Sequence, residues 1–177
     1  MTSDPRPGVL VTPEVQTALA GVAADAARRG DVDTLERALN AGVAPTSATP
    51  RGDSLLMLAA YYGQLSTVSL LLARGANPNQ TDAKGQTPLA GVAFKGLVDV
   101  ASLLVSAGAQ IDLASADGRT PLSMAAAFNR GAMVAWLLQH GASPEARDAS
   151  GNRPIDVATA MGATESVAAL GGGQTRV

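Results

Sequence analysis

Residues 82–109 read DAKGQTPLAGVAFKGLVDVASLLVSAGA. Thr87 followed by Pro88 indicates a helix start, because Thr can accept N–H groups of the first turn and Pro fits the first helical position. Gly96 and Gly108 suit the left-handed residue that ends many helices. Gly85 suits a tight turn with positive φ. The stretch therefore predicts a turn, a helix, a break, a second helix and a second break.

This unit recurs with a period of 33 residues, which is typical of a stacked repeat protein. Three separate positions keep that period: the turn, the break between the two helices and the end of the second helix. Asn129 takes the place of Gly at one break, and Asn is the next best residue for a left-handed conformation. The three series are Gly52, Gly85, Gly118 and Gly151; Gly30, Gly63, Gly96, Asn129 and Gly162; and Gly42, Gly75, Gly108 and Gly141.

The motifs at these positions resemble ankyrin repeats. Thr87-Pro88-Leu89 and Thr120-Pro121-Leu122 begin first helices in the manner of that family, and residues 71–79 and 137–142 resemble its second-helix ends. The resemblance spans roughly residues 13–170. It implies an all-α solenoid of stacked helix-turn-helix units with projecting β-hairpin loops, with about five repeats including caps. It also implies the family's usual activity, which is binding another protein.

The chain divides accordingly into an arm, a repeat domain and a tail. Thr12-Pro13 repeats the helix-start signal, and helices are expected from Pro13 to Arg29 and from Val32 to Asn40. The expected segments are a flexible N-terminal arm (1–12), an ankyrin repeat domain (13–170) with repeats at 13–48 (N-cap), 49–81, 82–114, 115–147 and 148–170 (C-cap), and a flexible tail (171–177).

Composition narrows the classes of function. The net charge of −2 gives no overall attraction to nucleic acid or anionic membrane, and the absence of Cys removes disulfides and thiolate chemistry. The N-terminus lacks a signal-peptide pattern and no run of about 18 apolar residues occurs, so a cytoplasmic location is expected. Lysine is rare whereas Arg, Ala and Gly are common, which is typical of a GC-rich genome such as many bacteria have.

No catalytic, cofactor or metal site is predicted. The single His, His140, precedes a helix-ending Gly and is expected to interact with the last helix carbonyls rather than to act as a general base. Residues 171–173 are three glycines without the Lys-Ser/Thr of a phosphate loop. Asp112, Asp117 and Asp148 lack the ligand spacing of a calcium loop. We therefore expect a protein that is not an enzyme.

The candidate partner-binding positions flank the turn glycines and end the first helices, because stacked repeats form a groove between these two features. Four of the five aromatic residues fall there, and exposed aromatic residues are favoured anchors. The alternative is that the rings fill gaps between helices. The predicted positions are Arg28, Arg29, Arg51, Asp53, Tyr61, Tyr62, Lys84, Gln86, Phe94, Lys95, Asp117, Arg119 and Phe128.

Other residues are expected to be structural. Trp136 occupies the register of Leu70 and Leu103 and is expected in the core. By resemblance to the family, Asp82 and Asp148 are expected to tie each loop to its neighbour.

Six of the candidate positions are basic and only Asp53 and Asp117 oppose them, which favours a partner with an acidic and partly apolar surface. Ordinary solvated surface charge is the alternative. The expected function is a non-catalytic protein-interaction scaffold or regulator, and the alternative is a dedicated inhibitor or immunity-type partner of one enzyme. Small-molecule substrates, nucleic acid and membranes are not expected as partners, and the protein is expected to be a monomer.

Overall fold

The structure is a computed structural model that describes residues 12–171. Most of the predicted arm and tail lies outside the described residues. Thr12 is the N-cap of the first helix, where its side chain accepts the Val15 N–H. Gly171, which we had assigned to the tail, instead belongs to the last helix.

The described residues form ten α-helices in five consecutive pairs, and the predicted bounds of the first two helices are confirmed. The helices are α1 Pro13–Arg29, α2 Val32–Asn40, α3 Leu55–Tyr61, α4 Leu65–Ala73, α5 Pro88–Lys95, α6 Val98–Ser106, α7 Pro121–Ala127, α8 Gly131–Gln139, α9 Pro154–Ala160 and α10 Thr164–Gly171.

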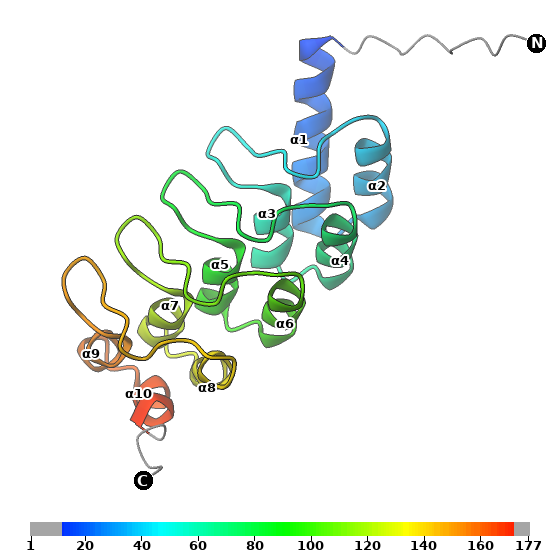
Figure 1. The fold of residues 1–177 in the computed structure, drawn as a ribbon. Helices are drawn as coiled ribbons and strands as arrows, with labels where there is room; N and C mark the ends of the chain where they lie inside the picture. The colour runs from blue at the N-terminus through cyan, green and yellow to red at the C-terminus, as the bar shows by residue number, and fades with distance from the viewer. Residues whose placement is uncertain (1–11, 172–177) are drawn as a thin grey trace, which may run out of the picture.

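The pairs stack in one direction to give a curved solenoid (Figure 1). The first helices of the pairs, α1, α3, α5, α7 and α9, form one row, in which each helix packs on the next. The second helices, α2, α4, α6, α8 and α10, form the other row. Long loops project from the side of the first row, so a loop-bearing edge runs along the whole stack (Figure 1). The all-α solenoid expected from the sequence is confirmed.

The helices begin at the residues that the sequence marked. Thr87 Oγ1 accepts the N–H of Ala90 at 3.1 Å, and Ser54 Oγ accepts that of Met57 at 3.1 Å. Asn129 adopts the predicted left-handed conformation with φ 55°. Its Oδ1 also accepts the N–H of Glu165 at 2.9 Å, so this residue caps α10 of the next pair.

The projecting loops are tight turns that pack on one another. Gly85 has φ +74°, and a Cβ at this residue would lie 2.9 Å from the backbone nitrogen of Ala116 in the next loop. The Ala116 N–H donates to the Lys84 carbonyl at 3.0 Å, which joins the two loops directly. Within residues 12–171 these loops contain no β-strand, and one isolated antiparallel bridge joins Ala48 and Ser54.

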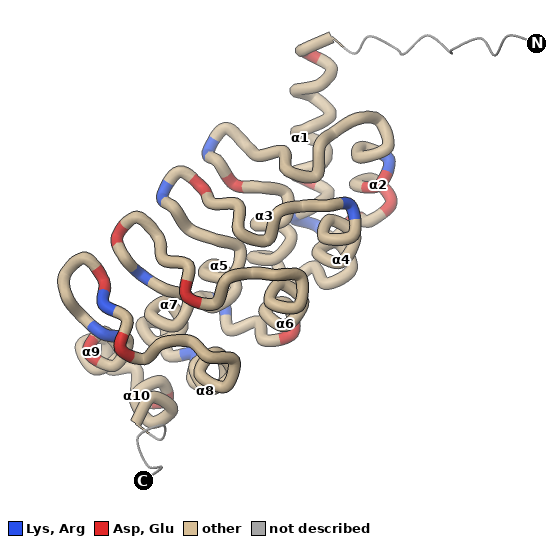
Figure 2. Tube along the Cα trace, viewed as in Figure 1, with Lys and Arg blue, Asp and Glu red and all other residues tan. Residues whose placement is uncertain are grey.

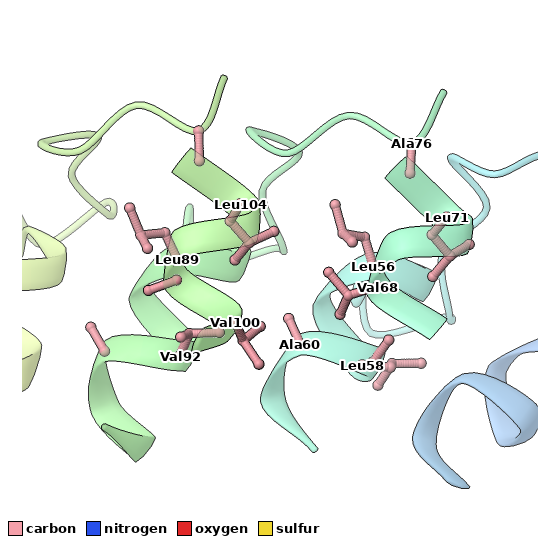
Figure 3. Close-up of a cluster of buried hydrophobic side chains, with 14 of the residues drawn as sticks. Leu56, Leu58, Ala60, Val68, Leu71, Ala76, Leu89, Val92, Val100 and Leu104 are labelled. Atoms are coloured by element: carbon pink, nitrogen blue, oxygen red, sulfur yellow. The ribbon is translucent and has the colours of Figure 1, made fainter. Parts of the chain in front are cut away.

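The core repeats the same few side chains in each layer (Figure 3). Leu56, Leu89 and Leu122 occupy one register in α3, α5 and α7, and all three are fully buried. A second set in α4, α6 and α8 is equally buried and consists of Leu71, Leu104 and Leu137. Alanines between the layers let the helices approach closely, which explains how a chain with 3% aromatic residues forms a continuous core.

Two structural assignments need correction. Trp136 lies at the edge of the core, where it is only partly buried, and its ring stacks on His140 with the centroids 3.8 Å apart. The predicted contact of His140 with a helix-end carbonyl is confirmed, because its Nδ1 lies 2.8 Å from the Trp136 carbonyl oxygen.

Asp82 does not tie its loop to the next one, since its Oδ1 accepts the N–H groups of Lys84 and Gln86 within its own loop.

Asp148 repeats this arrangement, and its Oδ1 accepts the N–H groups of Ser150 and Asn152. The N–H of Asn152 lowers the pKa of the Asp148 carboxyl below its ordinary value. The contacts between loops come from the backbone instead: Ala149 N–H donates to the Asp117 carbonyl at 2.9 Å. The carboxylates of Asp82 and Asp148 therefore each stabilise the turn of their own loop, and backbone hydrogen bonds join successive loops.

Candidate interaction groove

An open groove of about 480 Å³ lies between the projecting loops and the first helices of the pairs. We refer to it as the concave groove. It contains residues from α1, α3, α5 and α7 and from three successive loops. Its lining consists of Arg28, Arg51, Asp53, Met57, Leu58, Tyr61, Tyr62, Asp82, Gln86, Thr87, Gly91, Phe94, Arg119, Met124 and Phe128.

The four predicted aromatic residues form a continuous line of rings in this groove, which we call the aromatic row: Tyr62, Tyr61, Phe94 and Phe128. The Tyr61 and Tyr62 rings meet edge to face with centroids 5.5 Å apart. Tyr61 and Phe94 are nearly parallel at 6.1 Å, and Phe94 meets Phe128 edge to face at 4.3 Å. Aromatic pairs of this geometry stabilise each other, so the row links three repeats laterally.

The aromatic row remains open to solvent at its ends. Tyr62 keeps 55% of its surface exposed and Phe128 keeps 40%, whereas Tyr61 and Phe94 are half-buried. The rings therefore combine the two arrangements that the sequence allowed. They pack against one another, and they also present apolar surface to the groove. Phe128 and Tyr62 occupy the C-cap positions of α7 and α3, which places them just beyond the helices that hold the row.

The charges in the groove are more balanced than the sequence indicated. Arg28 pairs with Asp25 at 2.7 Å, and Arg119 pairs with Asp117 at 3.3 Å. Asp82 also lines the groove, so its lining holds three arginines and two aspartates. A hydrogen bond from Ser115 and the nearby Arg119 guanidinium lower the pKa of the Asp117 carboxyl. Figure 2 shows basic and acidic residues side by side along the loops.

Arg51 and Lys95 are two cations near the aromatic rings that form no ion pair among the described residues. Arg51 lines the groove, and Lys95 holds its Nζ 5.1 Å from the centroid of the Tyr61 ring. Neither takes part in any of the ion pairs found within residues 12–171. A cation held over a ring face remains accessible to an approaching anion, so positive charge lies beside the aromatic row.

Nine of the thirteen predicted site residues line the concave groove, and four lie outside its lining: Arg29, Lys84, Lys95 and Asp117. Sequence reasoning missed Leu58, Gly91 and Met124, which form part of the groove floor. These three are 33 residues apart and each lies one helical turn before a candidate helix-end position. The helical periodicity of the first helices would have identified them, because residues i and i+3 share a face.

The lining of the concave groove contains no His, Cys or Glu side chain. Within residues 12–171 there is no group of three or more His, Cys, Asp or Glu side chains that could hold a metal ion. Nor does this part of the chain contain a helix long and apolar enough to cross a membrane. What the groove offers is apolar surface, ring faces and a few charges.

The stacked helix pairs, the loop-to-loop contacts and the open groove define a helical repeat protein with a concave face. Comparison with family models identifies which one: residues 23–115 and 93–174 match the model described as ankyrin repeats (3 copies). The chain therefore belongs to the ankyrin repeat family. Repeats of this family generally serve as protein–protein interaction modules, and the family is typically non-catalytic. The search of curated proteins returned no match.

Proposed function

We propose that this protein is a non-catalytic scaffold or regulator that binds another protein in its concave groove and at its loop tips. The aromatic row carries the proposal. Four of the five aromatic residues of the chain line this one groove, and the two outer rings are 55% and 40% exposed. Rings fixed in place by their neighbours bury a large area on binding and lose little conformational entropy, which makes them effective anchors.

The charges support a partner that presents acidic and apolar groups together. Lys95 lies over the Tyr61 ring and Arg51 lines the same groove, and neither has an ion-pair partner among the described residues. An acidic side chain of the partner would meet them at the rim of the groove, where charge complementarity speeds encounter and excludes like-charged competitors. Because Arg28 and Arg119 already pair with aspartates, they contribute less to this attraction.

Affinity capture from native extract tests the location of the interface. The wild-type protein is compared with the Phe94→Ala/Phe128→Ala double variant and with Met161→Ala as a matched control. Met161 is 61% exposed and does not line the groove, so its removal takes away a similar exposed apolar group elsewhere. Partners should be retained by the wild type and by Met161→Ala, and lost from the double variant. Equal capture by all three would place the interface outside the groove.

Association kinetics of a captured partner test the electrostatic part. Charge reversal of Arg51 and Lys95, as Arg51→Glu with Lys95→Glu, should slow association at low salt by about tenfold and reduce its salt dependence. Reversal of Arg74 serves as the control, because this side chain pairs with Glu36 at 2.6 Å on the second-helix side of the stack. Unchanged kinetics in the first variant would refute an acidic partner.

The alternative role as a dedicated inhibitor makes a different prediction about the partner. An inhibitor of one enzyme would capture that enzyme and suppress its turnover at stoichiometric concentration. A scaffold would leave the turnover of its partners unchanged. Measuring the activity of any captured enzyme with and without the protein distinguishes the two roles.

A further inference from the structure

The floor of the concave groove has a gap at Gly91. Leu58, Gly91 and Met124 occupy the same register of α3, α5 and α7, and all three line the groove. The two outer residues carry side chains of similar size, whereas the central one has none. A Cβ at Gly91 would meet only the Cδ2 atom of Tyr61, at an ordinary contact distance of 3.5 Å. The middle of the floor therefore lacks one side chain that the fold itself could accommodate.

Nothing in the backbone explains this glycine. Gly91 lies inside α5 and does not have the positive φ of the turn glycines. A glycine inside a helix weakens that helix relative to alanine. The turn and helix-end glycines of the loops have a positive φ, and Gly131 has a close neighbour. Gly21 and Gly171 have neither, but they do not line the concave groove. Gly91 is the glycine of the groove lining, so its effect lies in the surface that it leaves open.

The walls of this gap are apolar, and the cation of Lys95 lies at its edge. Tyr61 and Phe94 stand nearly parallel, with an interplanar angle of 12° and centroids 6.1 Å apart. Leu58 and Met124 close the floor on the two sides. Lys95 is held over the Tyr61 ring at 5.1 Å. A ligand group that fills the gap must be apolar, and the groups that flank it meet positive charge.

We propose that the gap above Gly91 is a subsite for one aliphatic side chain, of the size of Leu or Met, carried by an acidic segment of the protein partner. The inference rests on the proposed function, because it identifies which part of the partner enters the groove. The size follows from the register, since the inserted side chain replaces the one that Leu58 and Met124 supply in the neighbouring repeats. The acidic flanks follow from Arg51 and Lys95.

Two substitutions separate this subsite from the groove as a whole. Gly91→Met fills the gap with the side chain found at the same register in α7, and Gly91→Ala fills it in part. Both remove a helix-interior glycine and create no contact shorter than 3.5 Å at the Cβ. They should raise the Tm by about 2–4 °C. A loss of binding in a variant that is more stable than the wild type cannot be a folding defect.

The probes are 12-residue peptides selected from a random display library against the wild-type protein and then synthesised. Methyl-labelled methionine reports where each peptide binds. Met57 and Met124 line the groove, whereas Met133 is fully buried and Met161 is 61% exposed outside the lining. Groove binding should shift the first two methyl signals and leave the other two in place. Fluorescence anisotropy gives the Kd for each variant.

The expected result is a consensus of one Leu, Ile or Met with flanking Asp or Glu, and a Kd that rises at least tenfold in Gly91→Met and severalfold in Gly91→Ala. Peptides that shift Met57 and Met124 and respond to Phe94→Ala, but bind Gly91→Met unchanged, overturn the subsite and leave the groove function standing. Peptides that shift neither methyl signal and ignore Phe94→Ala overturn the proposed function. A library without any binder counts against both.

Discussion

Substitution of Gly85 by Ala should destabilise the protein more than the same substitution at a glycine with equal backbone geometry but open surroundings. Gly85 has φ +74°, and an added Cβ would lie 2.9 Å from the backbone nitrogen of Ala116. That nitrogen donates its hydrogen to the Lys84 carbonyl at 3.0 Å. Gly75 has φ +86° and nothing within 4 Å of an added Cβ, so it provides the matched control.

The expected magnitudes follow from these two environments. An alanine in the left-handed region costs about 1–2 kcal/mol at either site. At Gly85 the added methyl group also pushes the neighbouring loop away and weakens one backbone hydrogen bond between the loops, which is worth about 0.5–1.5 kcal/mol. The gain from a stiffer unfolded chain is the same for both substitutions and cancels in their difference. Gly85→Ala should therefore lose about 1 kcal/mol more than Gly75→Ala.

Urea unfolding at pH 7 measures this difference. The transition is followed by circular dichroism at 222 nm and by the fluorescence of Trp136, the only tryptophan, and the two curves must coincide for a free energy of unfolding to be derived. Gly151→Ala is a second control, because this glycine has φ +81° in the same kind of loop with no neighbour within 4 Å. Equal losses in all three variants would refute the idea that loop-to-loop contact stabilises the stack.

Three further predictions concern single residues. Thr67→Val should raise the free energy of unfolding by about 1 kcal/mol in the same urea assay, because the Thr67 hydroxyl is buried without a hydrogen-bond partner and Val100 fills that register in α6. Asn129→Gly keeps the left-handed backbone but removes the cap of α10, so hydrogen exchange of α10 amides should accelerate by about fivefold, equivalent to about 1 kcal/mol. Backbone N–H donors hold the pKa values of Asp31 and Asp148 below their ordinary value. The stabilisation from these two carboxylates is therefore present above about pH 4 and is lost as the pH falls through the lowered pKa values. The Tm should decrease over that acidic range, and the decrease should be smaller in Asp148→Asn.

The helices were predictable because their signals are local. A Thr or Ser that caps, a Pro at the first position and a glycine at the end act within a few residues of one another. The structure places the cap of α5 at Thr87 and its end at Gly96, as the sequence indicated. The period of 33 residues then extends each local signal along the whole stack.

The details of the groove were less predictable because they depend on which neighbour fills each gap. Phe94 and Phe128 do not share a register, yet their rings meet at 4.3 Å. Ala127, which does share the register of Phe94, leaves the space that Phe128 enters. Periodicity assigns a residue to a face of its helix, but the direction of a side chain within that face depends on the size of its neighbours. The pairing of Arg28 with Asp25 is different, because these residues are i and i+3 on α1 and their spacing is visible in the sequence.

Variation between the repeats of this one chain supports a binding role for the groove. Some core registers keep one side chain in every inner repeat: Leu56, Leu89 and Leu122 are identical, and so are Ala60, Ala93 and Ala126, all of them fully buried. Another buried core register varies and holds Thr67, Val100 and Met133. The groove registers also change from repeat to repeat, so each repeat presents a different surface to the groove. Each of three groove registers holds three different residues in successive repeats: Leu58, Gly91 and Met124; Tyr61, Phe94 and Ala127; and Tyr62, Lys95 and Phe128. We therefore expect substitutions that make the groove registers uniform to preserve the fold and to abolish partner binding.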